Sequence, residues 1–111
     1  MNTHNDIRTA TVTIGGTQYT FAATMGAFLA YRIHAGHSTT KMDGEDPAEL
    51  ATWCYFLAEA GAKLTNTPFT LSLNEWLDGV AVNHLEPMAK AVAEVMQAFE
   101  AETETSEEKK T

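Results

Sequence analysis

The sequence contains a single cysteine, Cys54, among 111 residues, which excludes an intramolecular disulfide and a cysteine-rich zinc site. No apolar run approaches the roughly 18 residues of a membrane span, and the polar first residues lack the apolar core of a secretory signal. Basic residues are also few, since seven stand against 15 acidic residues for a formal charge of −8. Nucleic acids and anionic membranes both reward a positive surface, so we expect neither as a partner. The composition predicts a small, acidic, cytoplasmic domain.

The common catalytic signatures are missing too, because no phosphate-binding loop, dinucleotide fingerprint, nucleophile elbow or HExxH sequence is present. Cys54 falls within a predicted helix without a neighbouring cation, so we expect a buried structural thiol rather than a nucleophile. His34 and His37 lie three residues apart and offer one candidate for zinc, although Gly36 ends the predicted helix between them. We therefore expect no catalytic residue, cofactor or metal, and keep a metal-dependent enzyme built on the two histidines as an alternative.

The chain has the length of one domain, and 44% hydrophobic residues are enough to fill one core. Residues 9–14 and 17–22 alternate in polarity and are joined by Gly15-Gly16. This pattern predicts a β-hairpin, because glycine adopts the positive φ of a tight turn without steric cost. The side chains expected to share its buried face are Val12, Ile14, Tyr19 and Phe21.

Residues 25–35 are expected to form the first helix, with Thr24 as its N-terminal cap and Gly36 as its terminator. The large apolar residues that recur at helical spacing define its apolar face: Met25, Phe28, Leu29 and Ile33.

A second helix is expected over residues 47–63, because Asp46, Pro47 and Glu49 form a strong start signal. Its apolar face consists of Leu50, Trp53, Cys54, Leu57 and Leu64. Tyr55 and Phe56 point elsewhere, so apolar side chains surround the middle of the helix. Such a helix either lies at the centre of the fold or meets a partner with one side.

Ser72 and Glu75 form a capping box that opens a short helix, and a last helix is expected over residues 84–101. Residues 100–111 carry five acids and two lysines with no large apolar residue, so we expect a disordered tail. The predicted architecture is α+β, an N-terminal β-hairpin packed on about four α-helices. A flexible N-terminus (1–8) precedes a single domain (9–99), and the acidic tail (100–111) follows.

Aromatic residues are concentrated in the second and third helices and the loop between them. Any one of them is explained by core packing, but together they suggest more aromatic surface than a small two-layer fold covers. An uncovered aromatic cluster is most simply a docking surface for a helix or strand. The predicted partner-binding residues are therefore Trp53, Tyr55, Phe56, Phe69 and Trp76.

The order of these elements resembles a known family. A hairpin TIGGTQYTF (13–21) is followed at once by TMGAFLAYR (24–32), then by a polar loop, the aromatic helix, the segment LSLNEWLD (71–78) and a final amphipathic helix. Over residues 11–99 this pattern is similar to the tail assembly chaperones of long-tailed bacteriophages and prophages. One departure is the neutral to basic stretch 32–37, where that family has an acidic stretch ending in glycine.

The resemblance implies a non-enzymatic protein that coats the phage tape measure protein and helps to recruit tail tube subunits. Such a chaperone acts in the host cytoplasm and is absent from the mature virion. The resemblance also suggests a second, longer form made by a −1 ribosomal slip, here at Lys109-Lys110. Self-association stays open, and a small phage or bacterial adaptor, in head–tail joining or regulation, is the first alternative.

Overall fold

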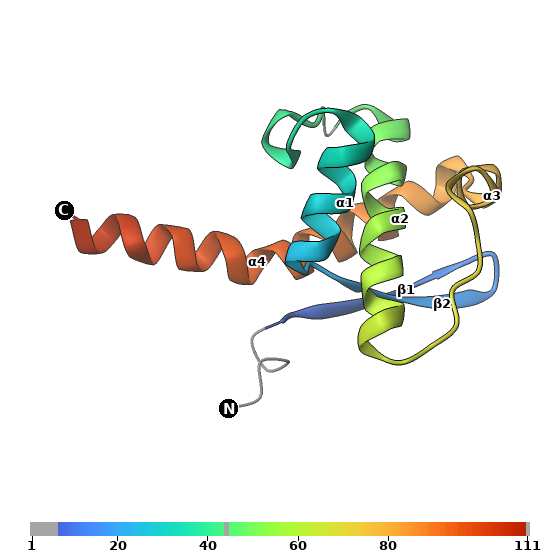
Figure 1. Ribbon diagram of the computed structural model, residues 1–111, viewed down its shortest axis with the longest axis horizontal. Coiled ribbons are helices and arrows are strands. Elements are labelled where there is room, and N and C mark those ends of the chain that lie inside the picture. Colours follow the sequence, from blue (N-terminus) through green and yellow to red (C-terminus); the bar gives the residue numbers. More distant parts are fainter. Residues whose placement is uncertain (1–6, 44, 111) are drawn as a thin grey trace.

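A computed structural model describes residues 7–43 and 45–110, and the described side chains end at Gln97. Within this part the chain forms two strands, four α-helices and two short 3₁₀ turns (Figure 1). Their order is β1 (Thr9–Ile14), β2 (Thr17–Ala22), α1 (Met25–Ala35), η2 (Thr39–Lys41), α2 (Pro47–Leu64), α3 (Leu73–Gly79), η3 (Val82–His84) and α4 (Leu85–Lys110). The predicted α+β class, a hairpin packed on four helices, is confirmed.

The antiparallel hairpin forms with the expected turn, because Gly15 (φ 59°) and Gly16 (φ 85°) both adopt positive φ. Two positive-φ residues match the right-handed twist of paired strands. The register pairs Ile14 with Thr17 and places the predicted apolar side chains on one face. On that face Val12, Ile14 and Phe21 are buried and Tyr19 is half-buried, which confirms the prediction.

Helix α2 lies at the centre of the fold. Of the two alternatives that the sequence left open for this helix, a central position or contact with a partner, the structure shows the central position. It starts as predicted, since the Asp46 carboxylate accepts a hydrogen bond from the backbone N–H of Ala48 at 3.0 Å. It contacts α1, α3, α4 and β2 (Figure 1). The residues of α2 that are essentially fully buried are Trp53, Cys54 and Leu57.

The backbone of α2 packs directly on β2 at Gly61. A Cβ at this position would overlap the carbonyl oxygen of Thr20 and would lie 3.2 Å from the backbone nitrogen of Phe21. Glycine at residue 61 therefore sets how closely the central helix approaches the hairpin.

Helix α3 begins with the predicted capping box. The backbone N–H of Glu75 donates to Ser72 Oγ at 3.2 Å, and the backbone N–H of Ser72 donates to Glu75 Oε1 at 2.8 Å. The helix ends at Gly79.

Helix α4 packs on β1 and buries Met88, Ala91 and Val95. It extends to Lys110, although the sequence indicated an end near residue 101. Alanine, glutamate and lysine, which dominate this stretch, all favour helix. Side chains after Gln97 lie outside the described residues, so the disordered tail stays a prediction. The flexible N-terminus (1–8) also stays a prediction, because residues 1–6 lie outside the described part of the chain. No helix in the described ranges is long and apolar enough to cross a membrane.

Candidate functional site

Helix α1 turns a different face to the core from the one that the sequence indicated. Its buried residues are Ala27 and Tyr31, whereas Met25 is 72% exposed, Leu29 49% and Ile33 73%. The expectation that these three large side chains form the packed face is wrong. They are spaced four residues apart and form one exposed row, which we name the α1 ridge.

Tyr31 explains this orientation, because its ring packs edge-on against Trp53 with centroids 5.4 Å apart. Its hydroxyl donates a hydrogen bond to Glu49 Oε1 at 3.3 Å. Burial, followed by the charge and the hydrogen bond of Glu49, raises the pKa of Tyr31, which keeps the hydroxyl protonated as a donor. The pair ties α1 to the first turn of α2 and leaves the ridge facing outward.

Glu49, which the sequence assigned to the start signal of α2, also contacts the loop between these helices. Its Oε1 accepts from the backbone N–H of Asp43 at 3.4 Å and lies 3.9 Å from His37 Nε2. One carboxylate thus connects α1, the loop and α2. This arrangement fixes the end of the ridge nearest Ile33.

Two of the five predicted partner-binding aromatics lie in the core. Trp53 is 1% exposed and Trp76 is 3% exposed. The Trp76 indole N–H donates to the carbonyl oxygen of Ala51 at 3.0 Å, and its ring lies 5.0 Å from that of Tyr19. Because both indoles are enclosed and Trp76 has its polar atom satisfied, we remove Trp53 and Trp76 from the candidate docking surface.

The other three predicted aromatics, Tyr55, Phe56 and Phe69, are half-buried and pack against the core. The Tyr55 hydroxyl donates to the carbonyl oxygen of Leu71 at 2.8 Å, and its ring lies 5.5 Å from Phe69. Burial raises the pKa of Tyr55, and the charges of two nearby glutamates add to the effect. These contacts show packing roles, while leaving part of each ring at the surface.

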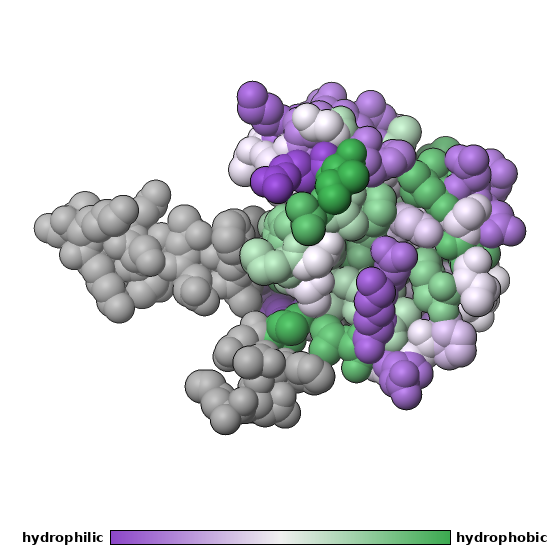
Figure 2. Space-filling view, viewed as in Figure 1, coloured by the Kyte–Doolittle hydropathy of each residue, from purple (hydrophilic) through white to green (hydrophobic). Residues whose placement is uncertain are grey.

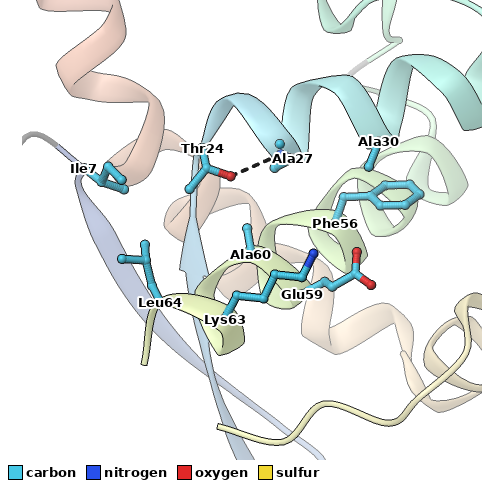
Figure 3. A pocket seen from close by; sticks show the side chains of 10 residues that line it. Ile7, Thr24, Ala27, Ala30, Phe56, Glu59, Ala60, Lys63 and Leu64 are labelled. Carbon is cyan, nitrogen blue, oxygen red and sulfur yellow. Dashed lines mark hydrogen bonds between the residues drawn. The ribbon is translucent and has the colours of Figure 1, made fainter. Parts of the chain in front are cut away.

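Phe56 helps to line a hollow of about 390 Å³ between α1 and α2, which we name the α1–α2 groove (Figure 3). Ile7 and Leu64 lie at one end of it and Phe56 at the other (Figure 3). Between them the lining residues are small: Gly26, Ala27, Ala30 and Ala60. Glu59 and Lys63, one helical turn apart on α2, are its charged lining residues.

The ridge and the groove adjoin because both use α1. Gly26 and Ala30 each follow a ridge residue by one position, which places them about 100° further around the helix. Figure 2 shows strongly hydrophobic surface in the region of α1 with hydrophilic residues beside it. Together the ridge and groove form a candidate docking surface.

The structure also describes the surroundings of the histidine pair and of Cys54, the two other groups that the sequence analysis considered. The His34 ring is 5.8 Å from Phe56 and the His37 ring is 5.8 Å from Tyr31. Among the described residues no group of three or more histidine, cysteine, aspartate and glutamate side chains is placed to hold a metal. Cys54 is fully buried, and burial raises the pKa of its thiol, which disfavours the nucleophilic thiolate at neutral pH.

The sequence did contain a signal for the ridge. Eight of the eleven residues of α1 are apolar, so an apolar face extends well beyond the arc that one packing contact covers. The same reasoning that marked α2 as surrounded by apolar residues applies to α1.

No protein-family model, curated protein or solved structure matches the chain.

Proposed function

We propose that this chain is a non-enzymatic binding protein that holds a partner segment against the α1 ridge. The observation that supports it is the exposure of Met25, Leu29 and Ile33 in one row on a single helix. A row of apolar residues at four-residue spacing is the pattern by which one helix packs along another. Exposed apolar surface of this kind commonly marks an interaction site.

The partner that we propose is a phage tape measure protein, and the role is that of a tail assembly chaperone that also helps to recruit tail tube subunits. The basis for this choice is the resemblance over residues 11–99. A chaperone must release its client, and three ridge side chains suit a small, transient interface rather than a permanent one. The net charge of −8 favours solubility of a protein with an exposed apolar row.

Co-expression with the tape measure protein encoded in the same genome tests the proposal. We expect the wild-type chain to keep that protein in the soluble fraction and to elute with it in size-exclusion chromatography. Leu29→Asp should abolish both effects, because a carboxylate on the ridge must be desolvated when the partner docks. Val82→Asp is the matched control, since Val82 is 83% exposed but lies in η3, outside the ridge.

Circular dichroism and thermal melting must show that both variants fold. Failure of the wild-type chain to bind the tape measure protein would refute the chaperone role. Full binding of the tape measure protein by Leu29→Asp would show that the ridge is not the binding surface. Mass spectrometry of purified virions distinguishes a chaperone from a head–tail adaptor, because the adaptor is retained in the particle and the chaperone is not.

A further inference from the structure

We infer that the α1 ridge and the α1–α2 groove together bind one amphipathic helix whose apolar face is flanked by acidic side chains. This inference rests on the proposed function only in taking a helical protein segment as the partner. It adds the shape and the charge that select that segment.

The shape of the surface suits a helix lying beside α1. Gly26, Ala30 and Ala60 have small side chains that leave the middle of the groove open, so the backbone of a partner helix can approach closely. Phe56 at one end and Leu64 at the other offer apolar contacts along its length (Figure 3). The ridge residues next to the groove can then fit between the side chains of the same partner helix.

The charged residues that line this surface are two basic and one acidic, Arg32, Lys63 and Glu59, whereas the chain as a whole is acidic. Residues 7–42 contain three basic residues and no acid, although the whole chain has 15 acids. Arg32 is exposed on α1 and lines a hollow of about 260 Å³ beside Met25 and Leu29. Lys63 is exposed at the groove, where Glu59 is the one acid among the described lining residues.

This distribution argues for an acidic partner and against a second copy of the chain. Acidic side chains along a docked helix would face Arg32 and Lys63, and they would be repelled from the acidic remainder of the protein. If two copies paired through α1, each copy would present Arg32 and Lys63 to a surface that carries the same two cations. Like charges placed opposite each other across an interface disfavour it.

Two synthetic 18-residue helical peptides provide the probe. Both carry the same leucine row at helical spacing, but one has glutamates on its flanks and the other lysines. Fluorescence anisotropy with the full chain in about 0.15 M salt, where a Debye length of about 8 Å screens the distant acidic residues, should show about ten-fold tighter binding of the glutamate peptide. The ratio should approach one in 1 M salt, where the Debye length is about 3 Å.

Charge variants test which residues select the partner. Arg32→Glu combined with Lys63→Glu should abolish or reverse the preference for the glutamate peptide. Lys90→Glu combined with Ala89→Glu and Ala93→Glu makes the same change in net charge at exposed residues of α4, away from the ridge and groove, so it should leave the preference intact. Equal binding of the two peptides to the wild-type chain would overturn the charge argument.

A filled groove tests the shape. Ala30→Phe places a large ring in the groove and should weaken both peptides at least about ten-fold, whereas Ala89→Phe on the exposed side of α4 should not. Unchanged binding by a folded Ala30→Phe variant would remove the groove from the site. The changes in backbone amide chemical shift on peptide binding should be concentrated in α1 and α2.

Further outcomes separate this inference from the proposed function. If the glutamate peptide binds as expected but the tape measure protein does not, the surface is correct and the chaperone role is wrong. If the tape measure protein binds and neither peptide does, the inference is wrong and the role stands. Sedimentation of a wild-type dimer that Leu29→Asp dissociates, with no competition from either peptide, would identify a second copy as the occupant.

Discussion

Replacing Gly61 by alanine tests the packing on which the whole arrangement of α2 depends. A methyl group on residue 61 would overlap the carbonyl oxygen of Thr20 in β2. Neither side of this contact can rotate away, because one is helix backbone and the other belongs to a paired strand. Relief therefore requires α2 to move away from the hairpin, which opens the core around Phe21.

The expected cost exceeds the benefit that alanine normally brings to a helix. Glycine to alanine within a helix stabilises by up to about 1 kcal/mol. Overpacking in a core typically costs 1–3 kcal/mol and more where backbone must shift, and here the clash is with backbone. We expect Gly61→Ala to lower the free energy of unfolding by about 3 kcal/mol, equivalent to a fall in Tm of roughly 15 °C.

Urea denaturation followed by circular dichroism measures this loss directly. Gly79→Ala is the control, because a Cβ at Gly79, the last residue of α3, would meet nothing within 4 Å. We expect that variant to change the free energy of unfolding by less than about 1 kcal/mol. A Gly61→Ala variant as stable as the wild type would refute the close contact of α2 with β2.

Three further predictions concern the core. Leu57→Ala removes a fully buried side chain of α2 and should cost 2–5 kcal/mol in urea denaturation; a loss below 1 kcal/mol would contradict its burial. Tyr55→Phe removes the donor to the Leu71 carbonyl and should cost about 1 kcal/mol in the same assay, whereas no loss would mean that the bond contributes nothing. Burial raises the pKa of Cys54, so above about pH 8.5 the unfolded chain releases a proton that the folded chain retains, and stability should fall between pH 8.5 and 10 by up to about 1.4 kcal/mol per pH unit. In Cys54→Ala the free energy of unfolding should fall less with pH over this range. An unchanged slope would show that other groups cause the fall.

Local signals in the sequence were sufficient for the starts of three helices and for the hairpin. Thr24, Asp46 and Ser72 each accept a hydrogen bond from a backbone N–H of the first turn, which is a property of a few neighbouring residues. The Gly15-Gly16 turn and its register are local in the same way. Such features form without reference to the rest of the fold.

The burial of particular side chains depends on distant contacts, and here the sequence was insufficient. The size of Met25 and Ile33 favoured them for the core, yet Tyr31 occupies it, and its hydroxyl donates a hydrogen bond to Glu49, 18 residues away. Trp76 was predicted to bind a partner because the aromatic residues together exceeded what a small fold covers, and its indole acceptor, the carbonyl of Ala51, lies 25 residues away where no local pattern reveals it. Amphipathic aromatic residues enter a core when such a partner exists, and composition does not reveal the partner.

The two sides of α1 have a consequence for how this protein can change over time. Ala27 and Tyr31 hold the helix in place, while Met25, Leu29 and Ile33 contact solvent. Substitutions in the exposed row therefore carry little penalty for folding, since surface changes usually alter stability by less than about 0.5 kcal/mol. The row is free to diverge rapidly between related chains and follow changes in a binding partner, while the interior of the domain stays under constraint.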